Sequence, residues 1–234
     1  MNTDASPQLP LALRYPPEQR FETFVDAPPG ALAQLQALAA TANEAAYISG
    51  VSGVGKTHLA LATCAVAEAA GRRAAYLPLK AASGRLRDAL EAHEDCAVVA
   101  LDGLESIAGQ RDDEVALFDF HNRARGRIAL LYAARATPDA LPLVLPDLRS
   151  RLGQCARIAL SPLDDDGRRA VLRARAERRG LVLEDAALEW LLRRVDRDLR
   201  SLTGLLDRLD KASLAAQRRL TVPFLRQLLE ADGA

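Results

Sequence analysis

The sequence predicts an α/β fold, a three-layer domain in which helices cover both faces of a parallel sheet, followed by a small all-helical domain. Three observations predict it. Short apolar or β-branched segments alternate with longer segments of helical period between residues 21 and 162. A glycine-rich loop joins the first strand of this series to the helix after it, and from residue 163 onward only helical patterns remain. Alternation of this kind is typical of a parallel sheet that is buried on both faces.

The individual elements follow from the period of the apolar residues. We expect strands at 46–49, 74–77, 97–102, 128–133 and 156–160. We expect helices between them at 31–40, 56–70, 84–92 and 113–125, and further helices at 164–179, 185–195, 198–217 and 223–230. The sequence therefore predicts an extended tail at 1–20, an α/β domain at 21–162 and a helical domain at 163–234.

Composition excludes several classes of protein. The 234 residues include 31 basic and 31 acidic side chains, so no overall field attracts DNA or an anionic membrane. The longest apolar runs are far shorter than the roughly 20 residues of a membrane-spanning helix, and the N-terminus lacks the pattern of a secretion signal. Cys64, Cys96 and Cys155 have no paired spacing, which favours buried thiols over disulfides or zinc ligands. We expect a cytoplasmic protein.

The glycine-rich loop predicts a phosphate-binding site. It reads Gly50, Val51, Ser52, Gly53, Val54, Gly55, Lys56, Thr57, which is a complete P-loop pattern between a strand and a helix. Its glycines leave backbone N–H groups free to point at phosphate oxygens at the positive end of a helix. Lys56 supplies a point charge, and the Thr57 hydroxyl is placed to ligate Mg²⁺. We therefore expect ADP or ATP with Mg²⁺ as the ligand.

A carboxylate at the end of a neighbouring strand should complete the site. Asp102 follows four apolar residues and lies where such a strand ends, so we assign it to the Mg²⁺ ion together with Thr57. Gly103 comes next, where many P-loop ATPases carry the acidic residue that activates water. Glu105 could substitute for it or could be an ordinary surface residue, and the sequence leaves both readings open.

These features together resemble the AAA+ superfamily, and within it the Hda family of regulatory homologues of the bacterial replication initiator DnaA. The resemblance covers nearly the whole chain. The segments that carry it are 21–24, the P-loop with His58, 76–79, 101–109, 145–152, 197–202, 206–214 and 220–224.

The resemblance implies further site residues and partners. Arg151, in the box Ser150-Arg151-Leu152, matches the arginine that reaches ATP held by a neighbouring subunit, and is our candidate catalytic residue. Arg200 matches the second sensor arginine, with Arg197 as the competing candidate. His58 joins the nucleotide-binding residues by its place after the P-loop. The family's partners are DnaA and the sliding clamp, the β subunit of DNA polymerase III, and a homo-oligomer stays open.

Two departures from the family pattern affect these expectations. The strand at 128–133 is followed by Ala134 and Arg135, where the family ends on a polar first-sensor residue. The Gly-x-Asn before the first helix is replaced by Ala27-Pro28-Pro29, near the expected adenine pocket. Both changes favour a nucleotide held as a structural ligand over one that is turned over, with weak or absent intrinsic ATPase activity.

The N-terminal tail contains a peptide that resembles the bacterial clamp-binding hexapeptide. Gln8, Leu9, Leu11 and Leu13 stand at its characteristic positions, and Pro10 limits the entropy lost on binding. An edge strand is the alternative for such alternating leucines. A DnaA-type initiator would continue beyond Phe224 into a helix-turn-helix domain, so we expect no sequence-specific DNA reader here, and only weak or indirect contact with DNA.

Three hypotheses follow. The first is a regulator that is bound to the DNA-loaded clamp and stimulates ATP hydrolysis on DnaA, which prevents over-initiation of replication. The second is a self-sufficient AAA+ ATPase of helicase-loader or remodelling type. The third is a binding module that tethers proteins to the clamp without catalysis.

Overall fold

A computed structural model describes residues 19–42, 44–194, 204, 222, 223, 225 and 226. Within this part of the chain, five strands form one parallel sheet in the order β2-β3-β4-β1-β5. The strands are β1 (Ala45–Ser49), β2 (Ala74–Pro78), β3 (Val98–Asp102), β4 (Ala129–Ala134) and β5 (Ala156–Ala159). The expected parallel sheet is thus confirmed, and the strand bounds differ from those expected by no more than one residue at either end.

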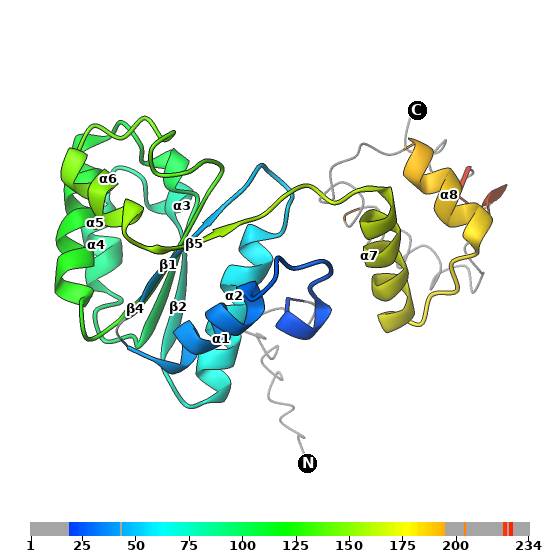
Figure 1. Ribbon diagram of the computed structural model, residues 1–234, viewed down its shortest axis with the longest axis horizontal. Helices are drawn as coiled ribbons and strands as arrows, with labels where there is room; N and C mark the ends of the chain where they lie inside the picture. Colours follow the sequence, from blue (N-terminus) through cyan, green and yellow to red (C-terminus); the bar gives the residue numbers. More distant parts are fainter. Residues whose placement is uncertain (1–18, 43, 195–203, 205–221, 224, 227–234) are drawn as a thin grey trace, which may run out of the picture.

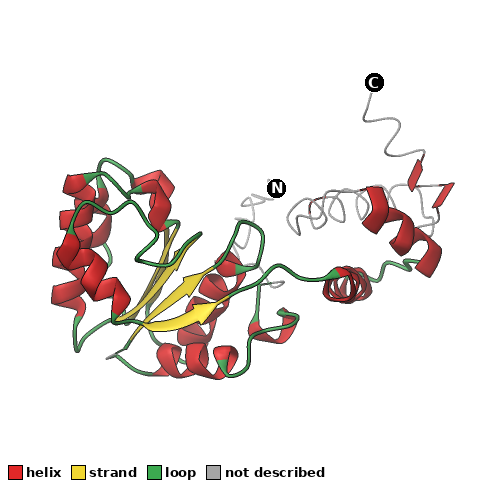
Figure 2. Ribbon diagram, turned by 45° about the horizontal axis from the view of Figure 1, so that its top comes forward, coloured by secondary structure: helices red, strands yellow, loops and turns green. Residues whose placement is uncertain are grey.

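Helices cover both faces of the sheet (Figures 1 and 2). On one face lie α1 (Ala31–Ala40) and α2 (Lys56–Ala69), and on the other lie α3 (Leu79–Ala82), α4 (Leu86–Glu91), α5 (Arg111–Ala124) and α6 (Pro146–Gly153). Successive residues of a strand point to opposite faces. Ala129, Leu131 and Ala133 of β4 accordingly pack against α1 and α2, whereas Leu130 and Tyr132 pack against the other helices.

Several short elements were not expected from the sequence. They are α3, α6 and two 3₁₀ turns, η1 (Phe21–Thr23) and η2 (Leu104–Ser106). Helix α6 offers only Leu148 and Leu152 to the core, too few apolar positions for a helical period to be recognised. It begins at Pro146, whose fixed φ angle suits the first position of a helix.

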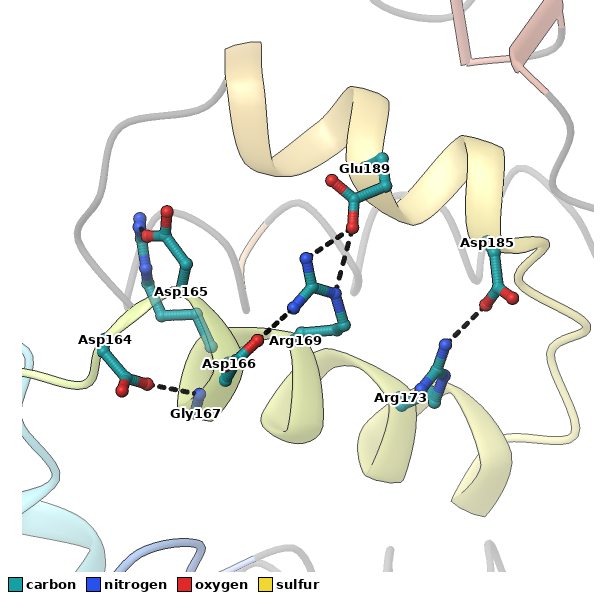
Figure 3. Close-up of polar contacts among 9 residues, drawn as sticks. Asp164, Asp165, Asp166, Gly167, Arg169, Arg173, Asp185 and Glu189 are labelled. Carbon is teal, nitrogen blue, oxygen red and sulfur yellow. Dashed lines mark hydrogen bonds and ion pairs between the residues drawn. The ribbon is translucent and has the colours of Figure 1, made fainter.

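Two helices after the sheet, α7 (Asp165–Arg178) and α8 (Asp185–Arg194), pack around Leu172, Leu188, Leu191 and Leu225. Asp164 caps α7 by accepting a hydrogen bond from the backbone N–H of Gly167 at 2.7 Å. Charged side chains then join the two helices (Figure 3). Arg169 donates to Glu189, with Nε 3.0 Å from Oε1, and also pairs with Asp166.

Other expectations concern cysteines and membranes. Cys64, Cys96 and Cys155 are buried thiols, as expected. In the part of the chain that the structure describes, no helix is both long enough and apolar enough to cross a membrane.

A histidine and a tyrosine form a polar pair inside the core between α5 and the sheet. The Nδ1 atom of His121 lies 2.9 Å from the hydroxyl of Tyr132, and both side chains are buried. Burial lowers the pKa of His121 from 6.5, and the nearby charges of Arg151 and Arg125 lower it further. Burial is also the main cause of the lowered pKa of His58 on α2.

These two histidines predict a loss of stability in mild acid. The unfolded chain binds protons near the ordinary pKa of 6.5, while the folded protein takes them up only at lower pH. The contribution of these two histidines to the free energy of unfolding is therefore fully present above about pH 6.5 and is lost as the pH falls below it. The loss is about 1.4 kcal/mol for each unit by which a folded pKa differs from the unfolded one. Urea denaturation at several pH values should show a smaller decrease for His121→Asn than for wild type. An equal decrease in both proteins would contradict this origin.

A second prediction concerns a close backbone approach at Gly50. A Cβ atom there would lie 2.5 Å from the carbonyl oxygen of Leu160 and 2.9 Å from Cγ2 of Val54. We expect Gly50→Ala to reduce the free energy of unfolding by about 1–3 kcal/mol. The control is Gly153→Ala in α6, where the nearest atom, Nη2 of Arg157, is 3.7 Å away. It should be neutral or stabilising by up to about 1 kcal/mol. Urea denaturation compares them, and equal destabilisation would refute the steric argument.

Candidate nucleotide-binding site

The glycine-rich loop connects β1 to the first turn of α2. Gly53 and Gly55 have positive φ angles of 82° and 99°, and Gly55 is the N-cap of α2. The ring of Phe24 lies directly over Gly55, since a Cβ atom there would be 2.6 Å from Cε2. Glycine thus allows both the turn and the close packing of Phe24. The loop presents backbone N–H groups at the positive end of α2, which is an anion-binding geometry.

Lys56 lies inside this loop. Its side chain is buried, and Nζ donates to the carbonyl oxygens of Gly50 at 2.6 Å and Val51 at 2.7 Å. Burial lowers its pKa from 10.5, while the carboxylates of Glu105 and Asp102 oppose that shift. The ammonium group is therefore held as a partly desolvated charge at the centre of the loop, where it would act strongly on a phosphate.

Three side chains meet at the carboxyl end of β3. The Thr57 hydroxyl donates to Oδ2 of Asp102 at 2.6 Å, and the Tyr76 hydroxyl donates to the same oxygen at 2.9 Å. Burial and the adjacent Asp102 raise the pKa of Tyr76, which keeps its hydroxyl a donor. Hydroxyl and carboxylate oxygens are the ligands that Mg²⁺ prefers, so Thr57 and Asp102 fit that ion. The sequence did not assign Tyr76 to the site; its place on β2, the strand paired with β3, was the available signal.

Glu105 and Arg135 form an ion pair beside these residues. Arg135 Nε lies 3.0 Å from Glu105 Oε1, and the Arg135 backbone N–H donates to Oε2 at 3.1 Å. Glu105 is thus an anchored carboxylate and not simply a surface residue. The strand before Arg135 ends on Ala133 and Ala134, both fully buried. The end of β4 therefore brings no polar side chain of its own to the site before Arg135.

His58 on α2 contacts the segment at 20–24, which precedes α1. Its Nε2 atom lies 2.8 Å from the carbonyl oxygen of Arg20 and 3.2 Å from Oγ1 of Thr23, and its ring meets Phe24 edge to face. Besides burial, the charges of Arg175 and Arg178 on α7 lower its pKa. The carbonyl oxygen of Arg20 can only accept, so Nε2 carries the proton of the neutral ring and donates it to this contact. The segment at 20–24 is thereby fixed beside the P-loop.

These residues line one cavity of about 990 Å³. Its polar lining includes Lys56, Thr57, Asp102, Glu105 and Arg135. Its other lining residues are mostly apolar and include Phe24, Val25, Ala27, Pro28, Pro29, Leu160, Pro162 and Val171 of α7. A ligand with a flat apolar ring and several negative charges matches such a lining.

Arg151 lies elsewhere. It is on α6, on the face of the sheet opposite to α2, and is not among the residues that line the cavity. Arg197 and Arg200 lie outside the described residues, as do Gln8, Leu9, Leu11 and Leu13 of the tail. The structure thus brings together Lys56, Thr57, His58 and Asp102, and separates them from Arg151.

Known proteins match both the helical C-terminal part of the chain and the fold of the chain as a whole. A family described as Hda, lid domain, matches residues 165–229. Domain III of the replication initiation protein DnaA from Thermotoga maritima has the same fold, with a TM-score of 0.77 and 21% identity over 93% of this chain and 98% of that one. AMPPCP-bound DnaA from Aquifex aeolicus matches with a TM-score of 0.70 and 20% identity over 85% of this chain and 67% of that one.

A second group of structures shares the fold. The RuvB Holliday junction branch migration motor of Thermotoga maritima matches with a TM-score of 0.66 and 16% identity, over 91% of this chain and 72% of that one. The expected fold, a parallel-sheet domain followed by a helical lid, is confirmed. Residues 165–229 thus match the Hda lid domain, and the chain as a whole has the fold of domain III of DnaA.

Proposed function

We propose that this protein is a nucleotide-binding regulator that stimulates ATP hydrolysis on DnaA while it is bound to the DNA-loaded sliding clamp. The observation that carries the proposal is the combination of an Hda lid domain with a complete phosphate loop, while Arg151 stands on a helix away from the cavity. We propose three parts, a clamp-binding tail at 1–20, a nucleotide-binding domain at 21–162 and a lid at 163–234.

The cavity would hold ADP or ATP in one orientation. The phosphates would lie on the N-terminus of α2 and against Lys56, with the base between Phe24 and Val171 on the apolar side. Thr57 and Asp102 would hold Mg²⁺, which supplies positive charge to the phosphate oxygens. Arg200 would add a contact from the lid.

The bound nucleotide would serve mainly as a structural ligand. Gly103 brings no carboxylate to activate water, and Ala133 and Ala134 bring no polar sensor to the end of β4. Glu105, the nearby carboxylate that could substitute, is engaged by Arg135. These features favour slow intrinsic hydrolysis and disfavour the self-sufficient ATPase. The released phosphate in the proposed reaction comes from ATP on DnaA.

Arg151 would act on that second nucleotide. A guanidinium group brought close to the γ-phosphate stabilises the charge that develops during phosphoryl transfer, and such arginines contribute about 10³–10⁵ to the rate in GTPases. Gln8, Leu9, Leu11 and Leu13 would bind an apolar cleft of the clamp and so concentrate the protein near DnaA on replicated DNA.

The phosphate-loop assignment predicts a specific loss of nucleotide affinity. Lys56→Ala should weaken binding of a fluorescent ADP analogue by about tenfold or more, since the buried charge at the centre of the loop is lost. Lys80→Ala removes the same charge from an exposed residue on the lining of the same cavity and should have an effect of about threefold or less. Fluorescence titration of both variants with the ADP analogue measures this difference. Wild-type affinity in Lys56→Ala would rule out the phosphate-loop assignment.

The regulatory role predicts loss of activity on a partner. ATP turnover by DnaA of the same organism is measured with clamp-loaded DNA, with and without this protein. Arg151→Ala should reduce the stimulation about 100-fold or more, and Gln8→Ala should abolish the clamp-dependent part. Arg157→Ala is the matched control, since Arg157 is a half-exposed arginine whose ion pair, with Asp139 at 3.6 Å, is on the surface.

The alternatives give different results in the same assay. If DnaA turnover is unchanged and this protein consumes ATP alone, it is an independent ATPase. If Arg151→Ala retains full stimulation, Arg151 is not the catalytic residue. If only clamp binding is found, the protein is a tethering module.

A further inference from the structure

The first turn of α5 carries a fully buried carboxylate. Glu114 has no exposed surface, and it accepts hydrogen bonds from three backbone N–H groups. Gly109 donates to Oε1 at 2.7 Å, Leu145 donates to Oε2 at 2.7 Å, and Val144 lies within reach of both oxygens at 3.1 and 2.9 Å. A buried carboxylate is costly unless such donors satisfy it. Glu114 is therefore a specific anchor and not a solvated helix residue.

The anchored segment leads directly into the helix of Arg151. Leu145 is the N-cap of α6, and its side chain forms no capping hydrogen bond. Arg149, in the second turn, donates from Nη2 to the carbonyl oxygen of Leu143 at 2.5 Å, which ties the helix back onto the same segment. The start of α6 is thus fixed by a side chain of a neighbouring helix and by one of its own.

Once the start of α6 is fixed, the packing of its remaining residues determines how the helix is oriented. Leu148 and Leu152 are fully buried in the core beside Leu117 and Phe120 of α5, and this contact sets the rotation of the helix about its axis. Arg151 lies between these two buried positions in sequence. The charge of Arg151 also lowers the pKa of His121 on α5. Helix α5 therefore supports α6 both at its beginning and near Arg151.

We propose that Glu114 is the positioning residue of the Arg151 helix, which holds the segment 143–145 by its backbone and so sets where Arg151 is presented to the nucleotide of a partner. This inference rests on the proposed function of Arg151. A displacement of about 1 Å in such a group costs about 100-fold in rate, so an anchor of this kind is as important for the reaction as contact with the substrate.

The neighbouring residue offers a matched control. Asp113 is also buried, and it accepts backbone hydrogen bonds from Gly84 at 2.7 Å and Leu86 at 3.2 Å. It anchors the start of α4, which does not carry Arg151. Asp113→Asn and Glu114→Gln thus make the same chemical change on one helix turn, with consequences for two different loops. In each variant an amide NH₂ replaces an accepting oxygen and opposes a backbone donor.

The test measures stimulation of DnaA turnover at saturating amounts of this protein, together with its affinity for a fluorescent ADP analogue. For Glu114→Gln we expect the maximal stimulation to fall about tenfold to 100-fold, with ADP affinity within about twofold of wild type, which a general loss of structure would not preserve. Asp113→Asn should keep the stimulation within about twofold. Full stimulation by Glu114→Gln, with Arg151→Ala inactive, overturns the proposal.

A second variant and a second readout keep the test independent of folding and of the proposed function. Val144→Pro deletes the N–H that reaches both oxygens of Glu114, at a residue whose side chain is exposed. It should reduce stimulation as Glu114→Gln does, and wild-type stimulation would contradict the anchor. Amide hydrogen exchange of both variants should be faster across 143–153, while Asp113→Asn affects 84–91. Unchanged exchange overturns the anchor. If Arg151→Ala alone retains stimulation, the proposed function fails while the exchange result still judges the anchor.

Discussion

Backbone hydrogen bonds at the end of β4 hold the site together. The N–H of Gly50 donates to the carbonyl of Ala134 at 3.2 Å, and that of Gly103 donates to Ala133 at 2.9 Å. The first residue of the phosphate loop and the residue after Asp102 are therefore both attached to β4. The N–H of Leu160 donates in turn to Ser49 at 2.8 Å. Because all five described strands are parallel, these attachments gather at one edge, where loops of α/β sheets form ligand sites.

Charged side chains of both signs line the cavity before any ligand binds. Lys56 and Arg135 lie near Asp102 and Glu105. Lys80, Arg175 and Asp26 line the cavity as well, so four cations and three anions surround it. A nucleotide with Mg²⁺ bound at Thr57 and Asp102 would neutralise one carboxylate and leave Lys56 to the phosphates. The Glu105–Arg135 pair would stay intact, because its backbone contact does not depend on the ligand. This arrangement is suited to retaining a nucleotide. The buried alanines at the end of β4 agree with this, because they bring no polar side chain that would sense hydrolysis.

The sequence predicts the sheet and the phosphate loop because both depend on local patterns. Apolar runs marked the strands, and the glycines and Lys56 marked the loop. The structure adds what depends on distant residues. Tyr76 on β2 reaches Asp102 on the neighbouring strand β3, 26 positions away, and Glu114 reaches Val144 and Leu145 across 30 and 31 positions. An acidic residue in the first turn of a helix is usually exposed, so no local signal separates Glu114 from its neighbours, and α6 lacked a period that would have shown what it anchors.

The sheet separates the two proposed activities of this chain. Alternate residues of β4 face α1 and α2 on one side, and α5 and α6 on the other. The helix that follows the phosphate loop thus lies on one face of the sheet, and the helix that carries Arg151 lies on the other. In the proposed function, the protein would hold its own nucleotide without withdrawing Arg151 from a partner. In that function, the bound nucleotide stabilises the domain, and Glu114 of α5 holds the segment that presents the arginine. These two contributions act on different faces, so mutations of Lys56 and Glu114 should separate binding from stimulation.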